Sequence, residues 1–385
     1  KNPAKKWKCM RKILEKETPE NVKQFWKQNA EEILNCTIAY TNLLESAKDT
    51  DKLKKPQEQE VSAILTHCKE ILEQLRTNVA SKWRSKDFHN LFTRFLAKSN
   101  KALIRKTAFE LMCNYMEILF EAGGGVELDT MLQLLRQAIN LHVLLPEVPG
   151  ATAACIKETM APVPANLLLV PSTTEPTIAE TVELFDSLLA AVTNATATGK
   201  APSIFEWWLT VAKTSYLVMF YPEVWKRIGL LNLADSHGFP ICPPSIQTVL
   251  IRRIESWRDN KLINDTLWNE GNAPFSMEVL RQACDLPLTH ADVILKIVDT
   301  YKYHLLHRRN TAVITDAVAQ GYWKDFATST SRVLTIDPQP KFAEAHSKLI
   351  TATISSYEYL SFNCLSLLTP ETWRHLQFIL LESTM

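Results

Sequence analysis

The segment from Asn100 to Glu121 carries the pattern that most restricts how this chain can fold. Its apolar residues recur at spacings of four, three, four and three, which places them along one stripe of a helix with about 3.6 residues per turn. That stripe comprises Ile104, Ala108, Leu111, Tyr115 and Ile118. Such a stripe has to be buried against a neighbour, so the segment predicts an amphipathic helix inside a larger helical assembly.

Two earlier segments repeat this pattern, with short polar breaks between them. The first has Val61, Ile64, Leu65, Cys68, Ile71, Leu72 and Leu75, and the second has Phe88, Leu91, Phe92, Phe95 and Leu96. Helices that stack in this way build extended surfaces and seldom build active sites. The pattern therefore favours an interaction protein over an enzyme.

Glycine usage supports the same fold class. The 385 residues include nine glycines, roughly a third of the ordinary usage of about 7%. Sheets with tight hairpins need glycine at positive φ, whereas helices joined by Pro, Asn and Asp do not. Since no alternating run indicates a strand pair either, the sequence predicts an all-α protein.

The predicted helices follow one another along most of the chain. They cover the lysine-rich start and then about 19–46, 58–77, 86–98, 101–121, 127–145, 178 onward, 203–219, 244–260, 274–284, 289–309, 311–334, 341–366 and 370–382. Helix pairs recur at about 40 residues, the length of HEAT or armadillo units, without a consensus residue pattern. The prediction is an irregular α-solenoid of HEAT/armadillo-like helix pairs.

A proline-rich stretch divides the chain. Residues 1–145 are predicted to form N-terminal helical repeats, 146–177 a proline-rich linker or long loop, and 178–385 continuing helical repeats. Within the first part, Gly123, Gly124 and Gly125 mark a helix end. They lack the lysine and the serine or threonine of a phosphate-binding loop, so they do not indicate a nucleotide site.

Charge is balanced overall but uneven at the start. With 43 basic and 42 acidic residues, the net charge of +1 gives no global attraction to nucleic acid. The first helix is nevertheless crowded with cations. A candidate interaction patch comprises Lys5, Lys6, Lys8, Arg11 and Lys12. The patch is either a solvated helix end or a docking site for an acidic partner or lipid headgroups.

No motif indicates chemistry. The eight cysteines are scattered singly, which predicts free thiols and a cytoplasmic location, and no apolar run is long enough for a transmembrane segment. His304 and His307 lie three apart on a predicted helix but lack a third and fourth metal ligand nearby. The pair Trp207 and Trp208 is read as core in preference to an exposed anchor. We therefore assign no catalytic, cofactor-binding or metal-binding residue.

Several short segments resemble a known family in order along nearly the whole chain. They are Val22-Lys-Gln-Phe-Trp, Val61-Ser-Ala-Ile-Leu, Lys69-Glu-Ile-Leu-Glu-Gln-Leu, Trp83 followed by Leu103-Ile-Arg-Lys, Tyr221-Pro, Val279-Leu-Arg-Gln-Ala-Cys-Asp-Leu-Pro and Thr369-Pro-Glu-Thr-Trp-Arg-His-Leu-Gln-Phe-Ile-Leu-Leu. Together they resemble the N-terminal helical region of the α subunit of the Ral GTPase-activating protein (RalGAP) complex, a relative of tuberin.

The resemblance implies a non-catalytic scaffold. In that family a distant C-terminal domain activates GTP hydrolysis with an asparagine thumb, and no segment of this chain matches that domain. The expected partners are a RalGAP β-like subunit and, through the full-length protein, a small GTPase of the Ral or Rheb type. A tuberin-type scaffold in a Rheb-regulating complex is one alternative. An α-solenoid cargo adaptor is another, and an enzyme with an unrecognised helical active site ranks third.

Overall fold

The computed structural model describes residues 2–46, 57–97, 100–139, 177–197, 202–216 and 244–269, together with isolated positions between 271 and 381. Within these residues the secondary structure is helical and contains no β-strand, which confirms the predicted all-α class. The chain divides into two compact units, one of residues 1–146 and 152–216 and one of residues 147–151 and 217–385. None of the described helices is both long enough and apolar enough to cross a bilayer.

The first unit opens with three helices, α1 (Pro3–Lys16), α2 (Pro19–Gln28) and α3 (Ala30–Ser46). Proline at the first helical position starts both α1 and α2, and the side chains of Asn2 and Thr18 cap them. The predicted single helix over 19–46 is wrong, because the chain breaks at Asn29. The Asn29 side-chain amide donates to the Phe25 carbonyl at 3.0 Å and so closes the end of α2.

The next three helices carry the second and third predicted stripes. They are α4 (Gln57–Gln74), a short α5 (Arg76–Ala80) and α6 (Ser85–Phe95). Every apolar residue of the two stripes is buried, as predicted. The chain between α5 and α6 turns through Lys82 and Arg84, which both adopt positive φ. A left-handed backbone at two residues other than glycine is uncommon.

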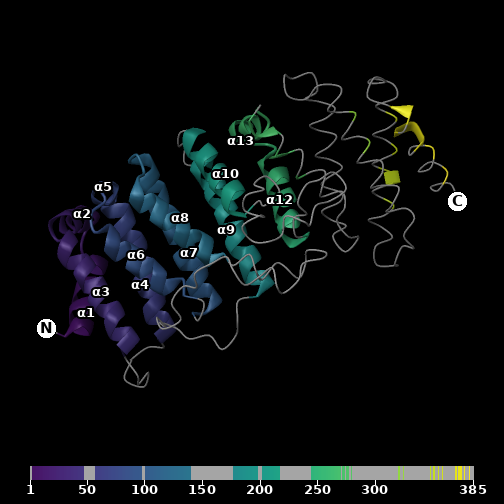
Figure 1. Ribbon diagram of the computed structural model, residues 1–385. Helices are drawn as coiled ribbons and strands as arrows, with labels where there is room; N and C mark the ends of the chain where they lie inside the picture. Colours follow the sequence, from purple (N-terminus) through teal and green to yellow (C-terminus); the bar gives the residue numbers. More distant parts are fainter. Residues whose placement is uncertain are drawn as a thin grey trace. The chain divides into compact units, whose positions relative to one another are not determined.

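Helix α7 (Ala102–Glu121) is the centre of the first unit. It packs against α4, α5, α6, α8, α9 and α10, and Figure 1 shows these helices alongside one another. All five residues of its predicted stripe are buried, but so are residues on its other sides, among them Phe109, Met112 and Met116. A helix that is apolar on most sides is a core helix, so α7 is the interior around which the other helices pack.

Three more helices complete the first unit, namely α8 (Val126–Ala138), α9 (Ile178–Ala197) and α10 (Pro202–Tyr216). A capping box starts α9: the Thr177 hydroxyl accepts from the Glu180 N–H, and the Glu180 carboxylate accepts from the Thr177 N–H at 2.9 Å. The same carboxylate accepts from the buried Arg105 guanidinium of α7 at 2.8 Å. The start of α9 is therefore fixed to the core helix.

In the second unit the structure describes α12 (Pro244–Trp257) and α13 (Lys261–Leu267). Helix α13 was not predicted, although Asn260 gives a sequence signal for it: its side chain caps the helix by accepting from the Ile263 N–H at 3.2 Å. Near the C-terminus, the Thr369 hydroxyl accepts from the Thr372 N–H at 3.2 Å and Pro370 is helical, which confirms the predicted cap.

Other predictions fall outside the described residues. They concern the proline-rich stretch of 146–177, apart from Thr177, and the helices predicted over 274–284, 289–309, 311–334, 341–366 and 370–382, apart from isolated helical positions. The predicted solenoid arrangement and its division into repeats remain predictions.

Candidate functional site

Helix α1 is held to the first unit by its apolar side. Trp7 is 3% exposed and stacks on Tyr40 of α3, with ring centroids 5.1 Å apart. The His67 ring from α4 lies nearly perpendicular to Trp7, with ring centroids 5.0 Å apart, and Trp26 of α2 lies beside the same histidine, with centroids 5.1 Å apart. Four helices therefore meet in one buried aromatic cluster of Trp7, Trp26, Tyr40 and His67.

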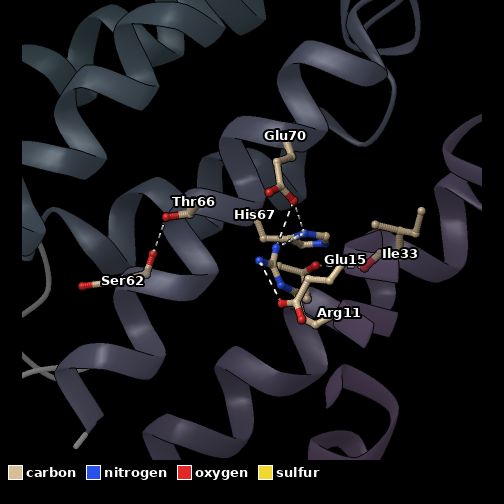
Figure 2. Close-up of polar contacts among 8 residues, drawn as sticks. Arg11, Glu15, Ile33, Ser62, Thr66, His67 and Glu70 are labelled. Carbon is tan, nitrogen blue, oxygen red and sulfur yellow. Dashed lines mark hydrogen bonds and ion pairs between the residues drawn. The ribbon is translucent and has the colours of Figure 1, made fainter. Parts of the chain in front are cut away.

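A polar group closes this aromatic cluster on one side. Figure 2 shows Arg11 and His67 both directed at Glu70. The Arg11 Nη1 atom lies 3.0 Å from Glu70 Oε2, and His67 Nδ1 lies 3.0 Å from the same oxygen. Because a carboxylate only accepts, His67 Nδ1 carries a hydrogen and donates it. The 3.4 Å separation of Arg11 Nη1 and His67 Nδ1 then arises because two donors converge on one acceptor.

His67 is neutral near pH 7. Its ring is fully buried, and this loss of solvation lowers its pKa below 6.5 despite the adjacent Glu70 carboxylate. The hydrogen bonds from His67 and Arg11 in turn lower the pKa of Glu70. In the neutral ring Nε2 is a bare acceptor, and it has no partner in the described part of the chain. The contacts that Arg11 of α1 makes with His67 and Glu70 of α4 therefore hold the two helices together.

The opposite side of α1 carries four lysines at helical spacing. Lys5, Lys8, Lys12 and Lys16 are all exposed and lie three or four residues apart, so they share one side of the helix, here called the lysine face. Among the described residues, none of these four lysines takes part in an ion pair. The lysine face is therefore available to an external anion.

The structure places the five residues of the predicted patch in three settings. Lys5, Lys8 and Lys12 belong to the lysine face. Lys6 lies to the side, 3.6 Å from Glu32 of α3. Arg11 turns inward to Glu70 and also lies 3.8 Å from Glu15. Lys16 joins the lysine face although the patch did not include it, and its spacing of four from Lys12 was the signal for this.

A second site lies where two turns of the chain meet. Gly123, Gly124 and Gly125 all have positive φ, and Gly125 is the residue that precedes α8. Lys82, from the turn before α6, reaches Glu127 of α8 at 3.1 Å. The ion pair joins the turn that precedes α6 to the one that precedes α8. The glycine triplet thus has a structural role, since its conformation suits residues without a Cβ.

A cavity of about 310 Å³ lies beside this ion pair. We call it the corner cavity. Its wall is formed by Ser85, Lys86, His89 and Asn90 of α6, Tyr115 of α7, and Val126, Glu127, Thr130 and Met131 of α8. Sequence reasoning missed this site, because three helices contribute to it and no single segment carries a motif.

The remaining candidates from the sequence have structural roles or cannot be placed. Trp208 is fully buried and its indole N–H donates to the buried Glu117 carboxylate at 3.4 Å, which confirms the core reading. Trp207 is half-buried and stacks on Phe120 at 4.5 Å. His304 and His307 lie outside the described residues. Within those residues, no three His, Cys, Asp or Glu side chains gather as a metal site would require.

The comparisons with known proteins give one match. The family model of the RALGAPA1 N-terminal domain matches residues 1–198, which is more than half of the chain. No curated protein and no solved structure matches the chain. The matched residues hold α1 to α9, the lysine face and the corner cavity. The chain therefore belongs to the RALGAPA1 N-terminal domain family.

Proposed function

We propose that the chain is the non-catalytic helical scaffold region of a RalGAP α-like GTPase-activating protein. In this role it helps to assemble the complex and positions a catalytic domain that lies elsewhere in the full-length protein. The observation that carries the proposal is the family match over residues 1–198. The continuous packing of helices around α7 supports it, because such packing presents helix faces outward and fills the interior with side chains.

The partner in this proposal is a RalGAP β-like subunit, and it docks an acidic surface on the lysine face. Four ammonium groups along one helix, none of them in an ion pair with a described residue, complement carboxylates across an interface. The hollow beside them suits such a contact: a cavity of about 590 Å³ has Asn2, Lys5, Lys6 and Cys9 on its wall. The free thiols of the described cysteines support a cytoplasmic location for the complex.

The test of docking is a charge reversal with a matched control. Lys8→Glu/Lys12→Glu reverses two charges four residues apart on the lysine face, and Lys23→Glu/Lys27→Glu does the same on α2. We expect the first double variant to weaken co-purification with the β-like subunit at least about tenfold, because two charge contacts with the partner are lost. The second should retain the subunit. Equal retention by both variants would show that the lysine face is not the docking surface.

The absence of catalysis is tested separately. Purified chain should leave the GTP hydrolysis rate of Ral and of Rheb unchanged, whereas a full-length protein that includes this region should raise the rate for one of them. Stimulation of Rheb in place of Ral would assign the chain to a tuberin-type complex. Stimulation of either GTPase by this chain alone would refute the scaffold proposal.

A further inference from the structure

The junction between α1 and α2 is an exposed segment of the chain. Every residue from Glu15 to Asn21 is exposed, although both helices bury a tryptophan elsewhere along their length. Glu17 and Thr18 both have extended backbone, so the chain passes from one helix to the next through a short extended link. Another protein can therefore reach this link while the aromatic cluster beneath α1 stays closed.

Thr18 and Pro19 form a sequence motif in this link. Protein kinases of the proline-directed class phosphorylate a serine or threonine that is followed directly by proline, whose fixed φ and missing N–H distinguish it from other residues. The chain has two such pairs, Thr18-Pro19 and Thr369-Pro370, and a glutamate follows each of them. Because the two short motifs are identical, their structural settings decide which threonine is the better substrate.

The hydroxyl of Thr18 is more available than that of Thr369. Thr18 Oγ1 accepts from the Asn21 N–H at 3.4 Å, which is long for a hydrogen bond, and it has no other partner among the described residues. Thr369 is only partly exposed, and its hydroxyl lies 2.9 Å from the Thr372 hydroxyl and 3.2 Å from the Thr372 N–H. Thr18 is therefore the better phosphate acceptor of the two.

Thr18 also lies next to the lysine face. Lys16, the last lysine of that face, is two residues before Thr18, and Lys12 is one helical turn further back. A phosphothreonine carries a charge of about −1.5 to −2 near pH 7. Glu17 and Glu20 flank Thr18 and repel this charge, so Lys16 is the nearest residue in sequence that can pair with it. A phosphate at Thr18 would thus neutralise part of the lysine face.

We propose that Thr18 is a phosphorylation site for a proline-directed kinase and that the phosphate weakens the binding of an acidic partner to the lysine face. In the transfer, Thr18 Oγ1 attacks the γ-phosphorus of ATP and the bond from that phosphorus to the ADP oxygen breaks. The hydroxyl proton passes to the catalytic aspartate of the kinase. The effect on docking rests on the proposed function, whereas the phosphorylation of Thr18 does not.

The first experiment tests the modification. The 385-residue chain is incubated with Mg²⁺, ATP and an active mitogen-activated protein kinase, and mass spectrometry locates the phosphate. We expect Thr18 to be labelled at least about tenfold faster than Thr369, because the Thr369 hydroxyl must first give up its contacts with Thr372.

Three variants accompany this experiment. Thr18→Asn removes the acceptor but keeps a capping side chain, and Pro19→Ala removes only the proline that the kinase selects. Each should abolish labelling of the link. Thr369→Asn is the matched control at the second motif, and it should leave the labelling of Thr18 unchanged.

The second experiment measures the effect on the lysine face without the β-like subunit. A fluorescent decaglutamate peptide is titrated with the phosphorylated and the unphosphorylated chain at constant, low ionic strength, and fluorescence anisotropy reports binding. Phosphorylation should lower the affinity by about five- to tenfold, because the phosphate cancels up to two of the four lysine charges. Kinase-treated Thr18→Asn should bind like the unphosphorylated chain, and Lys8→Glu/Lys12→Glu should bind weakly with or without phosphate.

Three results would overturn the inference. The first is no phosphate on Thr18, and the second is labelling of Thr369 as fast as that of Thr18. The third is equal affinity of the phosphorylated and unphosphorylated chains for the decaglutamate peptide. If phosphorylation weakens peptide binding but the β-like subunit binds both forms equally, the inference about Thr18 stands and the proposed docking of that subunit on the lysine face fails.

Discussion

His67 shows how a single buried ring can make the stability of the molecule depend on pH. Its pKa lies below 6.5 in the folded protein because burial disfavours the charged ring. The unfolded chain therefore binds a proton at higher pH than the folded chain does, and the free energy of unfolding falls as pH drops through 6.5. The lowered pKa of Glu70 acts in a separate window below 4.5.

The first prediction isolates this contribution. Between pH 7 and pH 5, the free energy of unfolding of the unmodified chain should fall more steeply than that of His67→Gln, because glutamine still donates to Glu70 but does not titrate. Urea denaturation at several pH values measures both slopes. Parallel curves for His67→Gln and the unmodified chain would contradict the assignment.

The second prediction concerns Gly125. Its φ of +108° and ψ of −166° lie in a region that is essentially restricted to glycine, and an added Cβ would lie 2.8 Å from Lys82 Nζ. Gly125→Ala should therefore lower the free energy of unfolding by about 1–3 kcal/mol. Gly123 also has positive φ (+92°), but an added Cβ there meets nothing within 4 Å, so Gly123→Ala carries backbone strain alone and should cost less. Urea midpoints compare the two, and an equal loss would show that positive φ, and not the contact with Lys82, sets the cost.

Single residues were the hardest features to predict. The sequence placed Arg11 in an exposed cationic patch, because helical spacing alone does not show that Glu70, 59 positions later, would draw its side chain inward. The corner cavity was missed for the same reason, since Tyr115 read as one more member of an apolar stripe. A buried polar partner that comes from another helix leaves no local trace in sequence.

At the scale of an element, α1 depends on one aromatic anchor. Trp7→Ala should weaken the packing of α1 on the rest of the first unit by about 3–5 kcal/mol, the usual loss of free energy for a large buried aromatic side chain. Amide hydrogen exchange of peptides from α1 should then speed up more than exchange in α7. Ile13→Ala is the matched control, because Ile13 is 40% exposed on the same helix. Uniform exchange changes across the chain would contradict a local role for Trp7.

Helices were predictable from sequence where their apolar periodicity was strong. Their boundaries were less predictable where two consecutive helices continue the same period. The stripes of α4, α6 and α7 are buried as expected, because a long apolar stripe admits few other outcomes. The break at Asn29 was missed because the apolar residues on both sides keep the helical period across it. Periodicity did not predict the central position of α7, because that position depends on buried residues outside its stripe.

At the scale of the whole molecule, the family match stops one helix short of the compact unit. It ends at residue 198, whereas the first unit continues to Tyr216 and includes α10, which packs on α9 and α7. Trp208 of α10 is fully buried and donates to the buried Glu117 carboxylate. A fragment that ends at residue 198 would therefore expose the surface that Trp208 covers.

The prediction is that a fragment of residues 1–216 is more stable than one of residues 1–198. Loss of α10 uncovers apolar surface and leaves Glu117 without the Trp208 donor, so we expect the shorter fragment to unfold at lower urea concentration and to self-associate. Size-exclusion chromatography and urea denaturation compare the two. Identical midpoints and elution would mean that α10 is not an integral part of this unit.

The cysteines of the first unit differ in a way that an experimenter can use. Burial raises the pKa of the Cys68 thiol to about 12, and it also raises the pKa of Cys36 and Cys113, so these groups remain protonated and covered. Cys9 alone among the four described free cysteines is exposed, and it lies on α1 beside Lys5 and Lys8. A fluorescent maleimide would therefore label this helix in preference to the core, and its emission would report directly when a partner covers the lysines.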